Sequence, residues 1–390
     1  MSRIKVMTVF GTRPEAIKMA PVVLELQKHS EHIEPVVAVT AQHREMLDQV
    51  LDLFAIKPDY DLDIMAQGQT LFDITGRALN GLNKVLAEAK PDLVLVHGDT
   101  TTTFVGALAS FYHQIAVGHV EAGLRTRNKY SPYPEEMNRK LTGSLADLHF
   151  APTKTSAANL LEEAVTKEDI FITGNTVIDA LLNTVQDDYV FEDELLSQID
   201  YQRRRVVLLT THRRENLGEP MRHVYQALRQ IVEEFSDVEV VFPVHRNPKV
   251  REVVRQELGG IERVHLIDPL EYQPFANLMA RSYLVLTDSG GIQEEAPSLG
   301  KPVLVLRDTT ERPEAVEAGT VKLIGTEKER VYSETQSLLA DEEEYRRMAT
   351  ACNPYGDGQA AKRIVQTILW RHGRLAQIPT MFGQDGKNCK

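Results

Sequence analysis

The sequence lacks the features of a disulfide-stapled, zinc-stabilised or membrane-spanning protein. Cys352 and Cys389 are the only cysteines among 390 residues, too few for a disulfide framework or a cysteine zinc site. The first apolar run, residues 4–10, is interrupted at Gly11. It is far shorter than the roughly 20 residues of a spanning helix and too short for a signal-peptide core. We therefore expect the chain to stay in the cytoplasm.

Composition and charge favour a folded, two-domain protein. Hydrophobic residues make up 42% of the chain and charged residues 26%, an ordinary globular balance with no low-complexity tract or solenoid repeat. Single cores rarely grow past roughly 250–300 residues, so this length favours two domains. The net charge of -12 argues against non-specific binding to nucleic acid, yet it permits a local basic pocket for a small anion.

The first half of the chain alternates apolar, strand-like runs with helical periodicity. We expect strands at residues 4–10, 35–40, 93–96, 115–120, 148–151 and 170–173, and helices at residues 16–27, 46–54, 102–113, 134–144, 154–163 and 177–182. Continuous apolar strands that alternate with helices are typical of a parallel sheet covered on both faces. Such sheets bind ligands at the carboxyl ends of their strands.

The second half repeats this pattern after a polar, acidic stretch at residues 185–204, which we interpret as the connection between domains. We expect strands at residues 205–211, 239–244, 264–267, 283–287 and 302–306, and helices at residues 221–235, 250–258, 272–281, 292–299, 328–340 and 342–351.

The predicted fold class is therefore α/β, with two Rossmann-like doubly wound domains facing a central cleft. We place the N-terminal domain at residues 1–183, the C-terminal domain at 184–358 and a polar tail at 377–390. An amphipathic helix at residues 359–376 is expected to pack back on the first domain.

The stretch from Thr287 to Pro297 reads as a strand end, a glycine turn and a helix start. Gly290 and Gly291 would let the backbone approach a ligand closely, and Ser289 with the first helix amides suits phosphate oxygens. Glu295, in the first turn of the helix, suits a ribose diol. A plain capped helix after a flexible turn would give the same pattern.

Three carboxylates follow strand ends or open a helix in the first half. Asp99 follows the apolar run 93–96, Glu121 follows 115–120, and Glu135 shares a helix face with Arg139. Helix caps and a surface ion pair would explain each one separately. Together, repulsion and burial would raise the pKa of at least one of them enough to make it an acid at neutral pH. That arrangement suits the abstraction and return of a proton.

Basic residues also follow the predicted strands. Arg13 and Lys18 follow the first strand, His212 and His245 follow the first two strands of the second half, and Arg312 follows its last one. Such groups would neutralise a departing diphosphate, although an exposed surface charge explains Lys18 equally well. The G-x-G-x-x-G spacing of a dinucleotide site is absent, and no spacing matches a zinc site, so we expect neither cofactor nor metal.

Six motifs occur in order along the chain. They are Gly11-Thr12-Arg13-Pro14-Glu15, His97-Gly98-Asp99, Gly118-His119-Val120-Glu121-Ala122-Gly123, Pro134-Glu135-Glu136, His212-Arg213-Arg214-Glu215 and Asp288-Ser289-Gly290-Gly291-Ile292-Gln293-Glu294-Glu295. Together they closely resemble the bacterial non-hydrolysing UDP-N-acetylglucosamine 2-epimerases, over residues 4 to about 374. The resemblance implies a glycosyltransferase-B type fold, a homodimer and cofactor-free, reversible conversion of UDP-GlcNAc to UDP-ManNAc. It further implies elimination of UDP to a glycal and its re-addition, with ManNAc feeding cell-surface polysaccharides.

The resemblance also implies residue roles. The acid/base set would be Asp99, Glu121 and Glu135, supported by Lys18, Arg139 and His212, with no assignment of which carboxylate removes the proton. The UDP contacts would be Arg13, Ser289, Gly290, Glu295 and Arg312, with Glu295 on the ribose, and we add Gly291 and His245. An activator site for a second UDP-GlcNAc would correspond to Gln42, His43 and Glu135. Glu45 and Gly68 stand where some activated members have a glutamine and an arginine.

Three rival functions fit parts of the pattern. A glycosyltransferase of the same fold would use the UDP site but would need only one base. A hydrolysing epimerase would release free ManNAc and UDP. A non-catalytic sugar-nucleotide sensor would bind the ligand without any exchange of the C2 proton.

Overall fold

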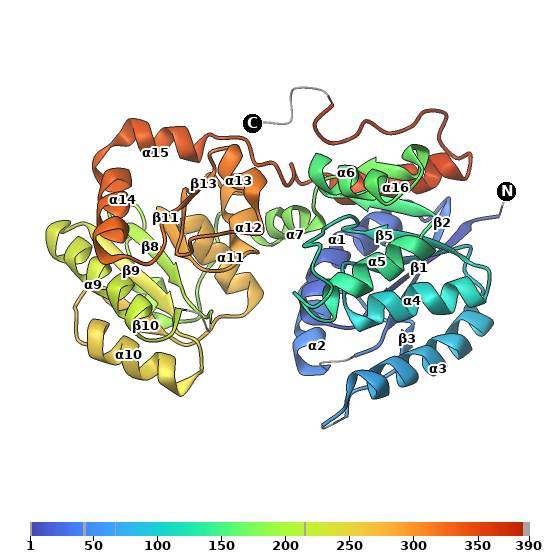
Figure 1. The fold of residues 1–390 in the computed structure, drawn as a ribbon, viewed down its shortest axis with the longest axis horizontal. Coiled ribbons are helices and arrows are strands. Elements are labelled where there is room, and N and C mark those ends of the chain that lie inside the picture. Colours follow the sequence, from blue (N-terminus) through green and yellow to red (C-terminus); the bar gives the residue numbers. More distant parts are fainter. Residues whose placement is uncertain (1, 42–43, 67, 214–215, 385–390) are drawn as a thin grey trace. The chain divides into compact units, whose positions relative to one another are not determined.

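The computed structural model describes residues 2–41, 44–66, 68–213 and 216–384. The chain divides into two compact units. Among the described residues, unit 1 contains those up to residue 180 together with residues 355–384, and unit 2 contains Leu181–Pro354. Each unit alternates strands with helices along the chain (Figure 1).

Unit 1 is built on a seven-stranded sheet in which all the neighbouring strands are parallel. The strand order is β3-β2-β1-β4-β5-β6-β7, which is that of a doubly wound sheet. The strands are β1 Ile4–Phe10, β2 Ile33–Val39, β3 Tyr60–Asp61, β4 Leu93–His97, β5 Ala116–Val120, β6 Leu148–Ala151 and β7 Ile170–Ile172.

The helices of unit 1 cover both faces of this sheet. They are α1 Arg13–Lys28, α2 Arg44–Leu53, α3 Leu71–Ala89, α4 Thr101–Tyr112, α5 Glu135–Leu145, α6 Lys154–Glu162, α7 Thr176–Thr184 and α16 Ala360–Arg371. Helix α1 packs against α2 and α16, whereas α4 lies between α3 and α5. Apolar residues of β1 and β4 join those of α3 and α4 in one core, which includes Val9, Val96, Leu82 and Val105.

Unit 2 repeats this plan with six parallel strands in the order β10-β9-β8-β11-β12-β13. The strands are β8 Arg205–Thr210, β9 Val238–Pro243, β10 Val264–Ile267, β11 Leu284–Thr287, β12 Val303–Val305 and β13 Val321–Leu323. The helices are α8 Glu194–Gln198, α9 Glu219–Glu234, α10 Pro248–Leu258, α11 Tyr272–Arg281, α12 Ile292–Ser298, α13 Pro313–Glu317, α14 Lys328–Ala340 and α15 Glu342–Ala349.

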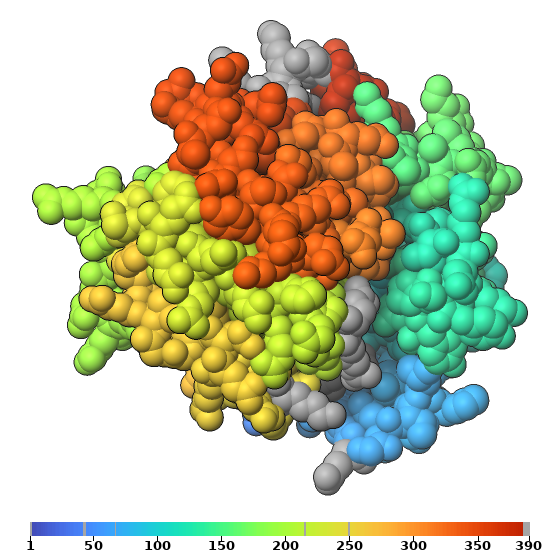
Figure 2. All heavy atoms as spheres, turned by 60° about the vertical axis from the view of Figure 1, so that its left-hand side comes forward, coloured from blue at the N-terminus to red at the C-terminus, as the bar shows by residue number. Residues whose placement is uncertain are grey.

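One face of the unit 2 sheet is covered by α9, with α10 and α14 beside it. Tyr225 of α9 is fully buried there, with its ring against Phe242 and its hydroxyl 2.9 Å from the Thr211 hydroxyl. Figure 2 shows the outside of this layer, where yellow-green, yellow and orange-red segments form one continuous surface.

The predicted α/β fold class is confirmed, since both sheets are parallel and doubly wound. The sequence prediction missed β3, α3, α8, α13 and β13. Helix α3 is the longest of the missed elements. Its apolar positions have helical spacing, but Gly76 and Gly81 interrupt the pattern. A β-carbon on Gly81 would lie 2.4 Å from the Leu62 side chain, so this glycine permits close packing of the helix.

One helix begins earlier than expected, and one stretch expected to be a connection contains a helix. Helix α1 begins at Arg13 rather than at residue 16, because Pro14 suits a first helical turn. Residues 185–204, interpreted as a connection, contain α8 and belong to unit 2, where Phe191 and Leu196 are buried.

Gly123 marks a close approach between the segment after β5 and helix α6. Its φ of +92° lies in the left-handed region, and an added β-carbon would lie 2.2 Å from the backbone oxygen of Ser156. The carbonyl of Gly123 also accepts a hydrogen bond from Asn159 Nδ2 at 3.0 Å. Steric room and backbone conformation both require glycine here.

We predict that Gly123→Ala lowers the free energy of unfolding by about 3 kcal/mol or more, because backbone strain and a clash with a carbonyl add up. Gly373→Ala is the matched control, since Gly373 has a φ of +68° but open space around its α-carbon. We expect that control to cost only the strain of about 1–2 kcal/mol. Urea denaturation of the two variants measures the difference, and equal losses would contradict the prediction.

Candidate functional site

The carboxyl ends of three neighbouring strands in unit 1 carry the predicted site residues. Strands β1, β4 and β5 lie side by side and run in the same direction, so the segments that follow them meet at one edge of the sheet. Arg13 opens α1 directly after β1, Asp99 follows β4, and Glu121 follows β5. The topology thus brings these three residues to the edge where doubly wound sheets bind ligands.

Glu121 is held by partners from two other elements. Its Oε2 lies 2.5 Å from Nζ of Lys18 in α1 and accepts a hydrogen bond from Asn175 Nδ2 at 2.9 Å. Nε2 of His97 lies 3.8 Å from the same oxygen. Glu121 is 8% exposed, and its φ of +62° is unusual for a residue with a side chain. Strained backbone of this kind clusters at functional sites.

Asp99 and Glu135 have different partners. Asp99 Oδ2 lies 2.6 Å from Nη2 of Arg139 in α5. Arg139 also pairs with buried Glu136 at 3.3 Å. Glu135 Oε2 is buried and has no hydrogen-bond partner among the described residues. The surface ion pair with Arg139, which was the alternative explanation for Glu135, therefore does not account for this carboxylate.

Glu15 is a structural residue that sequence reasoning did not single out. It is buried and accepts hydrogen bonds from the backbone N–H groups of Gly11 and Thr12, at 3.1 and 2.8 Å. Its other oxygen accepts from the hydroxyls of Thr100 and Thr103, at 2.6 and 3.1 Å. Burial raises the pKa of Glu15 although these hydrogen bonds lower it. The carboxyl group thus ties the turn after β1 to the start of α4.

Histidines on adjacent strands were also missed as a group. His97 ends β4, and the register of β5 with β6 places His119 opposite His149. Burial lowers the pKa of His97 to about 4 and that of His119 to about 3, so both rings are neutral at neutral pH. Nε2 of His119 lies 2.7 Å from the Gly98 oxygen. Within the described part of the chain, His97 has no hydrogen-bond partner at either ring nitrogen.

In unit 2, Asp288 occupies the end of β11 and organises the segment after β8. It is fully buried and accepts hydrogen bonds from the backbone N–H groups of His212 and Arg213, at 3.0 and 2.9 Å. Its side chain also meets His212 Nδ1 at 3.0 Å and Asn216 Nδ2 at 3.2 Å. Burial would raise the pKa of Asp288, but these hydrogen bonds hold it below its ordinary value. These contacts fix His212 beside the segment that follows β11, residues 288–291, which we call the glycine segment. The ring of His212 is exposed.

The glycine segment continues into α12 without a left-handed residue. Gly291 has a φ of -64° and a ψ of -42°, so helical geometry begins there, and the space beside the Gly290 α-carbon is open. Arg312 donates through Nε to buried Glu294, and Tyr272 donates to Glu295 at 3.3 Å. The backbone of Ser289 donates to the Thr287 hydroxyl at 2.9 Å. These residues of unit 2 therefore lie on and around one strand-to-helix connection.

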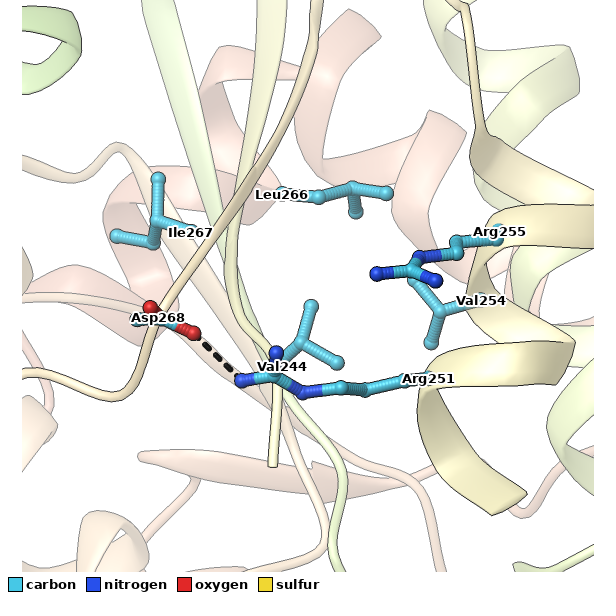
Figure 3. Close-up of a pocket in the computed structure, with 7 residues that line it drawn as sticks. All are labelled: Val244, Arg251, Val254, Arg255, Leu266, Ile267 and Asp268. Atoms are coloured by element: carbon cyan, nitrogen blue, oxygen red, sulfur yellow. Dashed lines mark hydrogen bonds and ion pairs between the residues drawn. The ribbon is translucent and has the colours of Figure 1, made fainter. Parts of the chain in front are cut away.

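A separate pocket of about 230 Å³ lies between α10 and the ends of β9 and β10 (Figure 3). Val244 and Ile267 supply apolar walls, and Arg251 crosses it to pair with Asp268 at 2.5 Å. His245, a predicted UDP contact, is exposed just after β9, where its Nδ1 accepts from the Asn247 backbone at 3.2 Å.

Three further expectations concern a metal site, a membrane-spanning helix and an activator site. Across residues 2–41, 44–66, 68–213 and 216–384, no three His, Cys, Asp or Glu side chains gather so that they could hold a metal ion. In the same residues, no helix has both the length and the apolar character to cross a membrane. Gln42 and His43, expected at an activator site, lie outside the described residues.

The sequence of this chain is similar to those of known proteins. A family model described as UDP-N-acetylglucosamine 2-epimerase matches residues 24–369. The UDP-N-acetylglucosamine 2-epimerase of Bacillus subtilis (strain 168) is 61% identical over 382 residues, which cover 98% of this chain and 99% of that protein.

Solved structures agree with these matches. One crystal structure of a UDP-N-acetylglucosamine 2-epimerase has a TM-score of 0.92 and 59% identity, covering 98% of this chain and 100% of the other. The UDP-GlcNAc 2-epimerase from Neisseria meningitidis, bound to UDP-GlcNAc, has a TM-score of 0.83 and 53% identity, covering 94% and 100%.

We predict that Asp288→Asn lowers the free energy of unfolding by about 2–4 kcal/mol at pH 7, because a buried, hydrogen-bonded charge is lost and its donors are left poorly paired. Asp268→Asn is the control, since that carboxylate is 79% exposed and pairs at the surface. We expect it to cost less than about 1 kcal/mol.

The pH dependence gives a second readout of Asp288. Because its pKa is lower in the folded chain than the ordinary 3.8, its stabilising effect is complete above that value and is lost as the pH falls through the folded pKa. The gap between wild type and Asp288→Asn should be constant from pH 7 to about pH 5 and should narrow below pH 3.8. Urea denaturation at stepped pH measures it, and a gap that widens with acid would contradict the assignment.

Proposed function

The chain belongs to the UDP-N-acetylglucosamine 2-epimerase family, and from this premise we propose that it inverts C2 of UDP-GlcNAc reversibly to give UDP-ManNAc. The route proposed is elimination of UDP to a 2-acetamidoglucal intermediate, followed by re-addition of UDP. The observation that carries the proposal is the placement of Asp99 and Glu121 after neighbouring strands, each paired with a cation, Arg139 and Lys18.

The elimination route follows from the weak acidity of the C2 proton. A carboxylate takes that proton while the bond between C1 and the diphosphate oxygen breaks, a C1–C2 double bond forms, and UDP leaves with the bonding electron pair. Protonation of C2 from the opposite face and return of UDP to C1 complete the inversion. Two acid/base groups are therefore needed, and Asp99, Glu121 and Glu135 supply three candidates.

The cations have a separate part in this chemistry. Lys18 lies against the Glu121 carboxylate and Arg139 against the Asp99 carboxylate, so each proton-transfer candidate has a positive charge beside it. A departing diphosphate gains negative charge, which positive groups and aligned N–H donors stabilise most strongly in the transition state. We assign this task to His212 and Arg312, together with Arg13.

We further propose that unit 2 binds the UDP moiety. Gly290 and Gly291 present backbone N–H groups where β11 leads into α12, with open space beside Gly290, and Ser289 would add its hydroxyl. Glu295 would accept hydrogen bonds from the ribose hydroxyls, and His245 would add a further contact. The Neisseria meningitidis relative is a complex with UDP-GlcNAc, which supports a UDP-sugar ligand for this chain.

The cellular setting belongs to the proposal as well. We propose a cytoplasmic homodimer that needs no added cofactor and supplies ManNAc for cell-surface polysaccharides. UDP-GlcNAc itself would activate the enzyme at a site that includes Gln42, His43 and Glu135. The glycosyltransferase, hydrolysing epimerase and sensor alternatives make different predictions in one experiment.

We expect the purified chain, given UDP-GlcNAc alone in D2O, to incorporate deuterium at sugar C2 and to form UDP-ManNAc. Elimination and re-addition exchange that proton with solvent, whereas a glycosyltransferase needs an acceptor and a sensor performs no exchange. Nuclear magnetic resonance of the sugar follows the label. Free ManNAc that appears in step with UDP would instead identify a hydrolysing enzyme, and no exchange at all would reject the proposal.

The same assay tests the carboxylates. Asp99→Asn and Glu121→Gln should each reduce exchange by about 10³-fold or more, since removal of a proton-transfer group costs 10²–10⁴-fold. UDP binding, measured by calorimetry, should stay within about threefold of wild type because neither residue is assigned to the nucleotide. Wild-type exchange in both variants would remove them from the chemistry.

We predict that Arg312→Ala weakens UDP binding by about 10- to 100-fold, because a charge-assisted contact to phosphate is worth about 1.5–3 kcal/mol. Arg229→Ala is the control in the same unit, since Arg229 is exposed and pairs with Glu233 one helical turn away. Calorimetric titration with UDP compares the two variants. An unchanged affinity in Arg312→Ala would assign its guanidinium to Glu294 alone.

A further inference from the structure

Asn175 is a buried side chain that the proposed chemistry has not yet used. It is 2% exposed and lies between β7 and α7. Its Nδ2 donates to Glu121 Oε2 at 2.9 Å, while its Oδ1 accepts from the backbone N–H of Val177 at 3.1 Å. The acceptor end of the amide is thus engaged by the first turn of α7, which points the donor end at Glu121. The amide orientation follows from both bonds together.

The backbone around Asn175 is fixed by the segment through which the chain returns to unit 1. The N–H of Asn175 donates to the Tyr355 carbonyl at 2.6 Å. Gly174 has a φ of +85°, and a β-carbon there would lie 3.2 Å from the α-carbon of Gly356. Arg363 Nη1 donates to the Thr173 carbonyl at 3.0 Å. The loop therefore has little freedom to move the Asn175 amide away from Glu121.

The same segment is tied to α7 one turn farther along. Asp179 accepts from the backbone N–H groups of Ala360 and Ala361, at 3.1 and 2.9 Å, which open α16. Arg363 pairs with Asp357 through two contacts of 2.7 Å. Residues 355–363 thus form a brace across the start of α7, and Asn175 is the side chain through which this brace reaches Glu121.

We propose, on the basis of the epimerase function above, that Asn175 is a positioning residue that fixes the orientation and the ionisation of Glu121. The titratable groups that face Glu121 are Lys18 from α1 and His97 at the end of β4. Lys18 supplies the charge, and the ring of His97 is neutral at neutral pH. A neutral amide donor favours the carboxylate form and limits its rotation without adding a second cation that would hold the proton-accepting group too weakly basic.

Asn175→Asp tests this role, because the new side chain keeps the shape and the acceptor for Val177 but turns the group facing Glu121 from a donor into a carboxylate. Two carboxylates within hydrogen-bond distance cannot both ionise easily. The rate of deuterium incorporation from D2O is measured from pH 5.5 to pH 9. In the variant, the fall in this rate on the acidic side should occur about one pH unit or more higher than in wild type. On the acidic limb, at pH values below both apparent pKa values, the rate at a given pH should fall by about tenfold or more.

Asn159→Asp is the matched control. Asn159 is another amide of unit 1 whose Nδ2 donates to a loop carbonyl, that of Gly123. Its pH profile should match that of wild type. A wild-type profile in Asn175→Asp, or an equal shift in Asn159→Asp, overturns the inference. Absence of exchange in the wild-type protein would instead refute the proposed function itself, so the two failures are distinguishable.

Asn175→Ser provides a second test that does not introduce a charge. The hydroxyl is too short to reach Glu121 but can accept a local backbone hydrogen bond. Loss of a hydrogen bond to a charged group corresponds to about a 10- to 100-fold drop in kcat, with KM for UDP-GlcNAc within about twofold because Asn175 does not bind the nucleotide. If Asn175→Asp does not fold, a wild-type kcat in Asn175→Ser overturns the proposal. A raised KM with unchanged kcat overturns it as well.

Discussion

The turn after β1 and the segment after β4, which carries Asp99, are held together by one buried carboxyl group, that of Glu15. It bonds to the turn after β1 and to the threonines that open α4, so the positions of Lys18 and Asp99 are set relative to each other. Burying such a group is costly, as the raised pKa shows. Five neighbouring donors, among them the Thr12 hydroxyl, offset that cost, and the result is a rigid edge at the centre of the sheet.

Unit 2 also has a buried carboxylate beside its central strands, at the equivalent position in its sheet. Strands β8 and β11 are neighbours at the point where the strand order reverses, as β1 and β4 are in unit 1. There Asp288 accepts hydrogen bonds from the N–H groups of His212 and Arg213, and its pKa is lowered because its interactions with His212 and Arg213 together outweigh the effect of burial. Each sheet therefore has a carboxylate at its topological switch point, where loops diverge and a ligand can enter.

Much of the fold and of the candidate site could be predicted from the sequence. Apolar runs mark most of the strands, and the turns that follow them mark the polar residues at the strand ends. The α/β class and the strand-end positions of Asp99 and Glu121 follow from that pattern. Helix α3 does not, because Gly76 and Gly81 break its pattern. The close contact of Gly81 with Leu62, which explains that glycine, exists only in the folded chain. The partners of Arg139 are likewise unpredictable from spacing, since the choice between Glu135 and Glu136 depends on where α5 faces the sheet.

The roles of Glu15 and Asn175 could not have been found from local sequence at all. Both act through bonds to residues at least 54 positions away, Glu15 to Thr100 and Asn175 to Glu121. The sequence signal for Glu15 is only its position in the first turn of a helix, which a simple capping role explains.

Unit 1 is assembled from two separate parts of the chain, and this has a consequence for its folding during synthesis. Helix α16 buries Ile364, Val365 and Ile368 and packs on α1, although some 330 residues separate the two along the chain. During translation, the face of unit 1 that α16 covers therefore stays exposed until the residues of α16 have been synthesised. Unit 2, encoded by a continuous stretch, is complete before its partner. A ribosome that stalls late would leave a folded second half attached to an unfinished first half, a state suited to recognition by chaperones.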